Sequence, residues 1–79
     1  MDNLQKYNKI IMETFEVSED ILQELKYQSV DSWDSVGHML LVASLEEQFE
    51  ITMDTDDIIE FSSYKKGLEI LEKNYNIKF

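Results

Sequence analysis

The stretch DSVGHMLLVASLEEQF, residues 34–49, decides the fold of this chain of 79 residues. Asp34 predicts the N-cap of a helix that runs to about Phe49, because an aspartate side chain accepts hydrogen bonds from the free amides of a first helical turn. Its apolar residues include Val36, Met39, Leu40, Val42, Ala43, Leu45 and Phe49. They extend further around the helix than a surface helix needs. The helix therefore either lies centrally in a bundle or presents apolar surface to a partner.

The segment before this stretch contains one helix and one long connection. Apolar residues recur at helical spacing from about Asn3 to Phe15 and predict a helix there. Residues 17–34 mix polar and apolar side chains without a sustained period and predict a long loop. Ser18 can cap one helical turn over Glu19 to Leu22 inside that loop.

Two further helices are expected after residue 49. Asp54 can cap a short third helix, with Asp56 and Asp57 in the first turn, where the helix dipole favours anions. Ser62 or Ser63 can cap a fourth helix. Its single apolar face consists of Tyr64, Leu68, Leu71 and Tyr75.

The fold class that these elements predict is all-α. No segment alternates between apolar and polar residues over a useful length, and the length allows one domain over residues 1–79. We expect a small four-helix bundle, with three longer helices, one short helix and a long loop between the first and second helices.

The charges are distributed unevenly along the chain. The formal net charge is -10, and between residues 34 and 63 there are acidic residues but no lysine or arginine. Such a block repels nucleic acid and anionic membranes and attracts basic protein surfaces. The plainer interpretation, that the charge only keeps the protein soluble, does not explain why the lysines lie outside this segment.

Composition also limits the chemistry that the protein can perform and the cellular compartment in which we expect it. The chain has no cysteine, which excludes disulfides and thiolate catalysis by the protein itself. No apolar run approaches the ~18 residues of a membrane span, and the first residues lack the features of a signal peptide. We therefore expect a cytoplasmic protein.

Neither an active site nor a metal site is predicted. His38 is the only histidine, and no second histidine or cysteine is present to build a familiar pair of nucleophile and base. The acidic run that begins at Asp54 suggests a calcium loop, but it lacks the glycine at the sixth position and the glutamate at the twelfth, where Lys65 stands. Helix capping explains these aspartates better.

Residues 34–49 resemble the acyl carrier and peptidyl carrier family. In that family Asp-Ser-Leu opens the second helix and Leu-Glu-Glu-x-Phe closes it, and here Asp34-Ser35-Val36 and Leu45-Glu46-Glu47-Gln48-Phe49 stand at matching distance. The resemblance covers most of the chain, because the other expected helices follow the family's order. Asp-Ser alone is a weak signal, whereas both motifs in an acidic chain of this length are a strong one.

The resemblance implies a reaction performed on this protein, not by it. A phosphopantetheinyl transferase would move 4'-phosphopantetheine from coenzyme A onto Ser35, and Asp34 would form part of the transferase recognition surface. The arm ends in a thiol and would hold acyl or aminoacyl groups as thioesters for partner enzymes with basic surfaces. We expect a monomer. Partner contacts are expected from Val36, Leu40, Glu46, Glu47, Asp54, Asp56 and Asp57.

The sequence departs from the family pattern beside the expected attachment site. Val36 replaces the usual leucine, and either side chain can anchor the helix in the core. Fatty-acid carriers commonly have further acids after the motif, whereas no acid occurs here between Asp34 and Glu46. If Val36 and Met39 point into the bundle, Leu40 lies near the rim, and Gly37 lets a partner approach closely. We therefore expect a carrier for a specialised biosynthetic pathway. The alternative is an unmodified acidic helical module that binds a basic partner.

Overall fold

The first helix begins at a capping box. The structure is a computed structural model that describes residues 1–79, and its first helix, α1, spans Asn3–Phe15. The Asp2 carboxylate accepts a hydrogen bond from the Gln5 amide at 2.8 Å, and the Gln5 side chain accepts one from the Asp2 amide at 3.2 Å. The chain leaves α1 at Glu16, which is in the left-handed conformation. The predicted bounds of this helix are confirmed.

The long connection contains a short 3-10 helix, η1, at Glu19–Glu24. Ser18 precedes η1 as predicted, but its hydroxyl bonds the Asp20 carboxylate and caps no backbone amide. Further along, an isolated antiparallel bridge joins Lys26 to Ser63, just before the last helix. This bridge ties the long loop to an element far from it in the sequence.

The second and third helices also begin where the sequence predicts. α2 spans Ser35–Phe49 and is capped by the Asp34 side chain. α3 spans Thr55–Glu60. Asp54 occupies the N-cap position of α3, yet its side chain makes no capping bond; its carbonyl oxygen instead accepts the amide of Ile58 at 3.0 Å.

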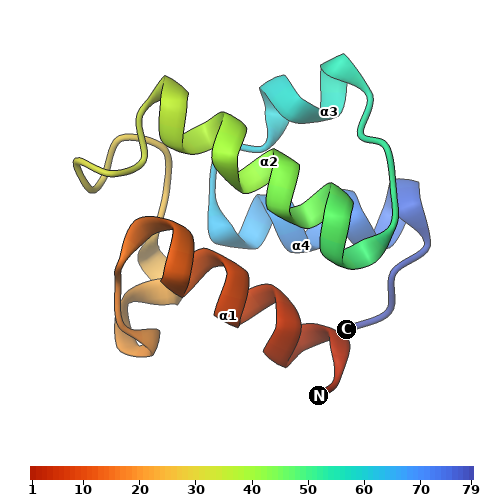
Figure 1. The fold of residues 1–79 in the computed structure, drawn as a ribbon, viewed down its shortest axis with the longest axis horizontal. Coiled ribbons are helices and arrows are strands. Elements are labelled where there is room, and N and C mark those ends of the chain that lie inside the picture. Colours follow the sequence, from red (N-terminus) through yellow and green to blue (C-terminus); the bar gives the residue numbers. More distant parts are fainter.

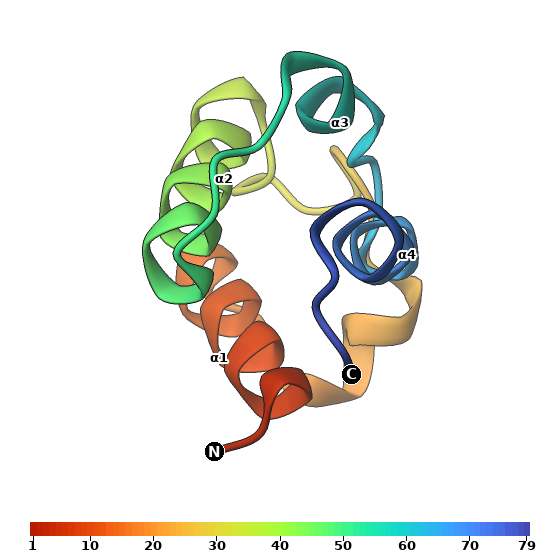
Figure 2. The ribbon, with the colours of Figure 1, turned by 90° about the vertical axis from the view of Figure 1, so that its right-hand side faces the viewer.

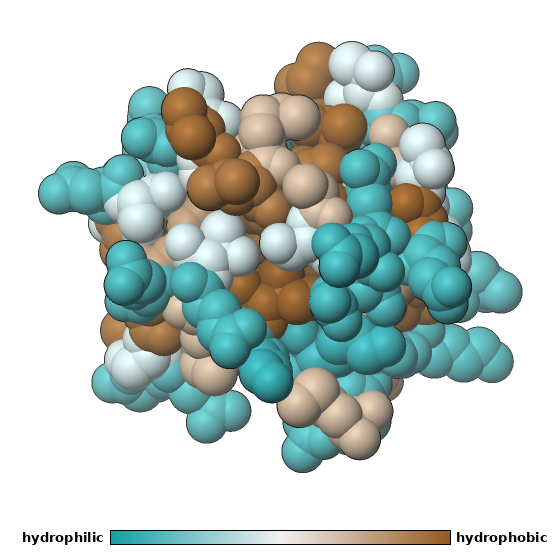
Figure 3. All heavy atoms as spheres, viewed as in Figure 1, coloured by the Kyte–Doolittle hydropathy of each residue, from teal (hydrophilic) through white to brown (hydrophobic).

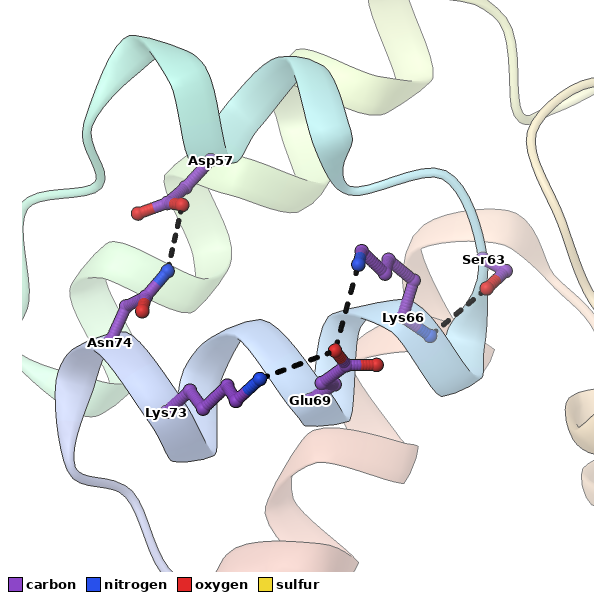
Figure 4. A network of polar contacts seen from close by, with 6 residues as sticks. All are labelled: Asp57, Ser63, Lys66, Glu69, Lys73 and Asn74. Atoms are coloured by element: carbon purple, nitrogen blue, oxygen red, sulfur yellow. Dashed lines mark hydrogen bonds and ion pairs between the residues drawn. The ribbon is translucent and has the colours of Figure 1, made fainter.

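The last helix, α4, spans Tyr64–Tyr75. Of the two candidate serines, Ser63 is the cap, because its hydroxyl accepts a hydrogen bond from the Lys66 amide at 3.0 Å (Figure 4). Asn76 ends the helix in the left-handed conformation.

One continuous core of 16 buried apolar side chains holds these elements together. Its largest fully buried members are Trp33, Tyr7, Phe15 and Phe61. The rings of Phe15 and Trp33 stack with centroids 4.7 Å apart, which joins α1 to the loop before α2. A core rich in large aromatic rings lets a short chain bury much surface with few residues.

The helices form the predicted all-α bundle. Figure 1 shows α2 running antiparallel to α1, with α4 parallel to α2 behind them and the short α3 across the top. From the side, α1 and α2 lie along one flank and α3 and α4 along the other (Figure 2). No helix is long and apolar enough to cross a membrane. In this arrangement the beginning of α2 lies next to the loop before it and to α3. These segments, with the residues that follow α3, form the candidate site.

Candidate functional site

Ser35 is the first residue of α2, and it is exposed. The preceding residue, Asp34, is held by two hydrogen bonds. The Asp34 carboxylate accepts the Gly37 amide at 2.8 Å, and the Asp34 carbonyl accepts the His38 amide at 2.8 Å. The first amides of a helix have no carbonyl partner within the helix, so this end favours an anion. The fold thus places Ser35 at the exposed and capped start of α2, where the helix end favours an anion.

The absence of a side chain at Gly37 is required by packing inside the protein and not by contact at its surface. Gly37 is buried, and a β-carbon at this position would overlap the carbonyl oxygen of Ser32 and lie 3.2 Å from the Phe15 ring. The expectation that Gly37 opens the surface to a partner is therefore wrong. Its physical role is to let the first turn of α2 approach the preceding loop.

A mostly apolar hollow of about 320 Å³ lies beside Ser35, between α2, α3 and the loop before α2. Met39 from α2 and Ile58 and Ile59 from α3 supply much of its wall, and Phe61 and Tyr27 complete the apolar part. No local pattern in the sequence predicts this hollow. Its residues come from four segments, which are the loop before α2, the beginning of α2, α3 and the connection from α3 to α4, and only the tertiary fold brings them together.

His38 belongs to the same hollow and lies three residues after Ser35. Its Nδ1 is 3.0 Å from the indole nitrogen of Trp33, and its Nε2 is 2.7 Å from the carbonyl oxygen of Ile58. Both ring nitrogens are therefore already engaged by the fold. The side chain is partly buried and joins three segments, a role that a lone histidine in the sequence did not indicate.

An exposed apolar patch adjoins the hollow and shares part of its wall. It consists of Val36, Met39, Leu40 and Ile59, whose exposed fractions are 67%, 54%, 58% and 72%. The three residues of α2 are neighbours at helical spacing, and Met39 and Ile59 both line the hollow. Figure 3 shows hydrophobic surface near the beginning of α2 and over α3, and hydrophilic surface over the end of α2. Exposure of Leu40 is confirmed, but Val36 and Met39 do not point into the bundle, and Val36 does not anchor α2 in the core.

The predicted acidic contact residues fall into two groups. Glu47, Asp54 and Asp56 are exposed. Glu46 is partly buried, and its carboxylate accepts a hydrogen bond from the Met53 amide at 2.9 Å, so it also has a structural role. The exposed acids at the end of α2 lie about 18 Å from Ser35 along the helix, since each residue rises about 1.5 Å.

Asp57 is directed into the protein, which corrects its expected role in partner contact. It is 8% exposed, and its two carboxylate oxygens accept hydrogen bonds from Asn74 at 2.9 Å and from the Tyr75 hydroxyl at 2.7 Å. Figure 4 shows its carboxylate pointing from α3 toward Asn74 at the end of α4. Burial and, after it, the hydrogen bond to Asp57 raise the pKa of Tyr75. Asp57 therefore attaches α3 to α4.

No group of three or more histidine, aspartate or glutamate side chains is arranged to hold a metal ion. The acidic run at residues 54–57 forms the N-cap and first turn of α3. The exposed polar residues at the hollow are Ser35 and Ser62, with Asp34 next to Ser35 in the chain. No family model, curated protein or solved structure matches this chain.

Proposed function

We propose that this chain is a carrier protein that receives phosphopantetheine from coenzyme A on Ser35 and holds acyl or aminoacyl groups as thioesters. The observation that carries the proposal is the exposed Ser35 at the capped beginning of α2, where it lines the hollow and precedes the first residue of the apolar patch, Val36. The resemblance of residues 34–49 to the carrier family supports the same site. The thiol that this cysteine-free chain lacks would arrive on the arm.

The proposed modification is a phosphoryl transfer to serine. The Ser35 oxygen forms a bond to the phosphorus that bears pantetheine, the bond from that phosphorus to the bridging pyrophosphate oxygen breaks, and adenosine bisphosphate leaves. The serine proton passes to a base of the transferase. The product is an anionic diester at a helix N-terminus, where the unpaired amides of the first turn stabilise negative charge.

Partner enzymes would meet two kinds of surface around the arm. The apolar patch lies next to Ser35, and the exposed acids Glu47, Asp54 and Asp56 lie further along α2 and at the start of α3. A complementary partner has an apolar depression at the arm and lysines or arginines about three helical turns away. The patch takes the place of acids beside the serine, which supports a specialised pathway over general fatty-acid synthesis.

Intact-mass measurement tests the attachment site. The chain is incubated with coenzyme A, magnesium and a phosphopantetheinyl transferase, and we expect the mass of one arm to be added. Ser35→Ala should add none. Ser62→Ala is the matched control, because Ser62 is an exposed serine of the same hollow and should leave loading unchanged. Loading of Ser35→Ala at another serine would overturn the assignment.

A second function needs no arm. This function is that of an unmodified interaction module, which docks a basic protein partner through the apolar patch and the acidic residues. This alternative predicts no mass gain with any transferase, together with partner binding that Ser35→Ala does not change.

A further inference from the structure

The hollow beside Ser35 is small and shallow. Its volume of about 320 Å³ is at the low end of the range for pockets that hold small ligands, about 300–1,000 Å³. Two of its wall residues, Met39 and Ile59, are 54% and 72% exposed, so this part of the wall leaves the hollow open to solvent. A space of this size and depth holds a compact apolar group and does not enclose a long chain.

Two other hollows of the surface are larger but mostly polar. One lies between α1 and α2, and its lining includes Lys6, Lys9 and Glu13. The other lies beside the start of α3, and no apolar residue lines it. Ser35 lines neither of them. An apolar group attached to Ser35 therefore has its nearest apolar seat in the hollow between α2 and α3.

The wall of this hollow has few polar groups that an amide could use. Both ring nitrogens of His38 are engaged, Nδ1 with the indole nitrogen of Trp33 at 3.0 Å and Nε2 with the carbonyl oxygen of Ile58 at 2.7 Å. An amide that leaves water for such a wall loses hydrogen bonds, which is costly unless they are replaced. The hollow therefore favours the part of a ligand that has methyl groups and no amide.

We propose that the hollow seats the two methyl groups nearest the phosphate of a phosphopantetheine arm on Ser35, and that the acyl or aminoacyl cargo stays in solvent. This inference rests on the proposed function. In the arm, one oxygen and one methylene separate the phosphorus from the carbon that bears these methyl groups. The two amides follow, and the thiol comes last. The methyl groups thus reach the wall that begins at Ser35, whereas cargo enters only if the arm turns back and lays its amides along apolar side chains.

The seat uses only part of the apolar patch. Met39 and Ile59 line the hollow, whereas Val36 and Leu40 do not. A seated arm therefore covers one half of the patch and leaves the other half, on α2, to a partner. The root of the arm is held against the protein, and the thioester end remains free to enter the active site of a partner enzyme.

NMR of the loaded chain tests the seat. The wild type is loaded from coenzyme A in which these two methyl groups are isotope-labelled, and nuclear Overhauser effects from them are recorded. We expect contacts with the side-chain methyl groups of Met39 and Ile59. A chain that is shown by its mass to hold the arm, yet has no such contacts, would overturn the seat and leave Ser35 as the attachment site. A chain that takes up no arm would overturn both.

Two glutamine variants form a matched pair. Ile59→Gln changes a wall residue of the hollow, and Leu40→Gln changes an equally apolar, exposed residue outside it. Both positions are largely in solvent, so both variants should fold. The contacts between the labelled methyl groups and Met39 should be lost in Ile59→Gln and kept in Leu40→Gln. Equal loss in the two variants would show that the arm adheres to the whole patch, against the proposed seat.

A comparison of two cargoes tests whether the cargo stays outside. The chain is loaded from the acetyl and from the octanoyl thioester of coenzyme A, and the melting temperatures of the products are compared. A group that is seated only in the folded protein raises its stability. We therefore expect equal melting temperatures, and no contact between the terminal octanoyl methyl group and Met39 or Ile59. A higher melting temperature with octanoyl cargo, or such a contact, would show that cargo occupies the hollow and would overturn the inference.

Discussion

α4 and α2 use their apolar residues differently. On α4 they face inward, with Tyr64, Ile70 and Leu71 buried and Leu68 and Tyr75 partly buried. On α2 the burial is divided. Its middle supplies Leu41, Val42 and Leu45 to the core, while its beginning leaves Val36, Met39 and Leu40 largely in solvent. α4 thus has the apolar residues that packing requires, and α2 has more than packing requires.

The excess on α2 lies where the proposed attachment site is. Scattered exposed apolar side chains are normal, but a contiguous group beside a hollow and a presented hydroxyl indicates a contact surface. One helix can therefore have two roles. The middle of α2 stabilises the bundle, and under the proposed function its beginning serves recognition. Each of the following predictions tests this division.

The largest difference is expected between two adjacent leucines of α2. Leu41 is completely buried and Leu40 is 58% exposed. Leu41→Ala should lower the free energy of unfolding by about 2–5 kcal/mol, whereas Leu40→Ala should change it by less than about 0.5 kcal/mol. Urea denaturation followed by circular dichroism measures both. Equal losses would mean that the exposed patch also contributes to the core.

A smaller loss in the free energy of unfolding is expected when Gly37 is replaced. A methyl group there meets the Ser32 carbonyl, which is backbone and cannot move aside without shifting the loop. Gly37→Ala should therefore cost about 1–3 kcal/mol despite the better helix propensity of alanine. Val36→Ala, one residue earlier and exposed, is the matched control and should be nearly neutral in the same thermal or urea unfolding experiment. A stabilised Gly37→Ala would contradict the close approach.

The free energy of unfolding should fall at alkaline pH because of Tyr7 in the core. Burial, and after it the nearby Tyr64, raises the pKa of Tyr7 well above its ordinary value of 10.0. The unfolded chain releases this proton first, so the stability is complete below about pH 10 and is lost as pH rises above it. Tyr7→Phe should reduce the alkaline loss while removing the 2.8 Å hydrogen bond to the Tyr64 carbonyl. An unchanged alkaline profile in this variant would exclude Tyr7 as the cause.

The sequence predicted the helices better than it predicted the site. Caps and apolar spacing are local features, so the bounds of α1 and α2 and the place of Asp34 could be derived from nearby residues. The burial of Gly37 and Asp57 could not, because it depends on contacts with the loop before α2 and with α4. The role of His38 depends in the same way on Trp33 and on Ile58, twenty residues further along the chain.

The smallest effect is expected from the exposed acids. Glu47→Lys combined with Asp56→Lys should weaken transferase binding about tenfold at low salt, because each exposed ion pair contributes only about 0.2–1 kcal/mol. Added salt should reduce the difference. Glu24→Lys combined with Glu72→Lys makes the same change in net charge on η1 and α4 and should have little effect. Equal weakening of transferase binding in both double variants would show that net charge, and not the local acidic surface, controls binding.

We propose that the beginning of α2 presents Ser35 for modification. The most direct measurement is the intact mass of wild type, Ser35→Ala and Ser62→Ala after incubation with coenzyme A, magnesium and a phosphopantetheinyl transferase. We expect one added arm in the wild type and in Ser62→Ala, and none in Ser35→Ala. A wild-type mass that stays unchanged with transferases of broad specificity, or an arm found on Ser35→Ala, would contradict it.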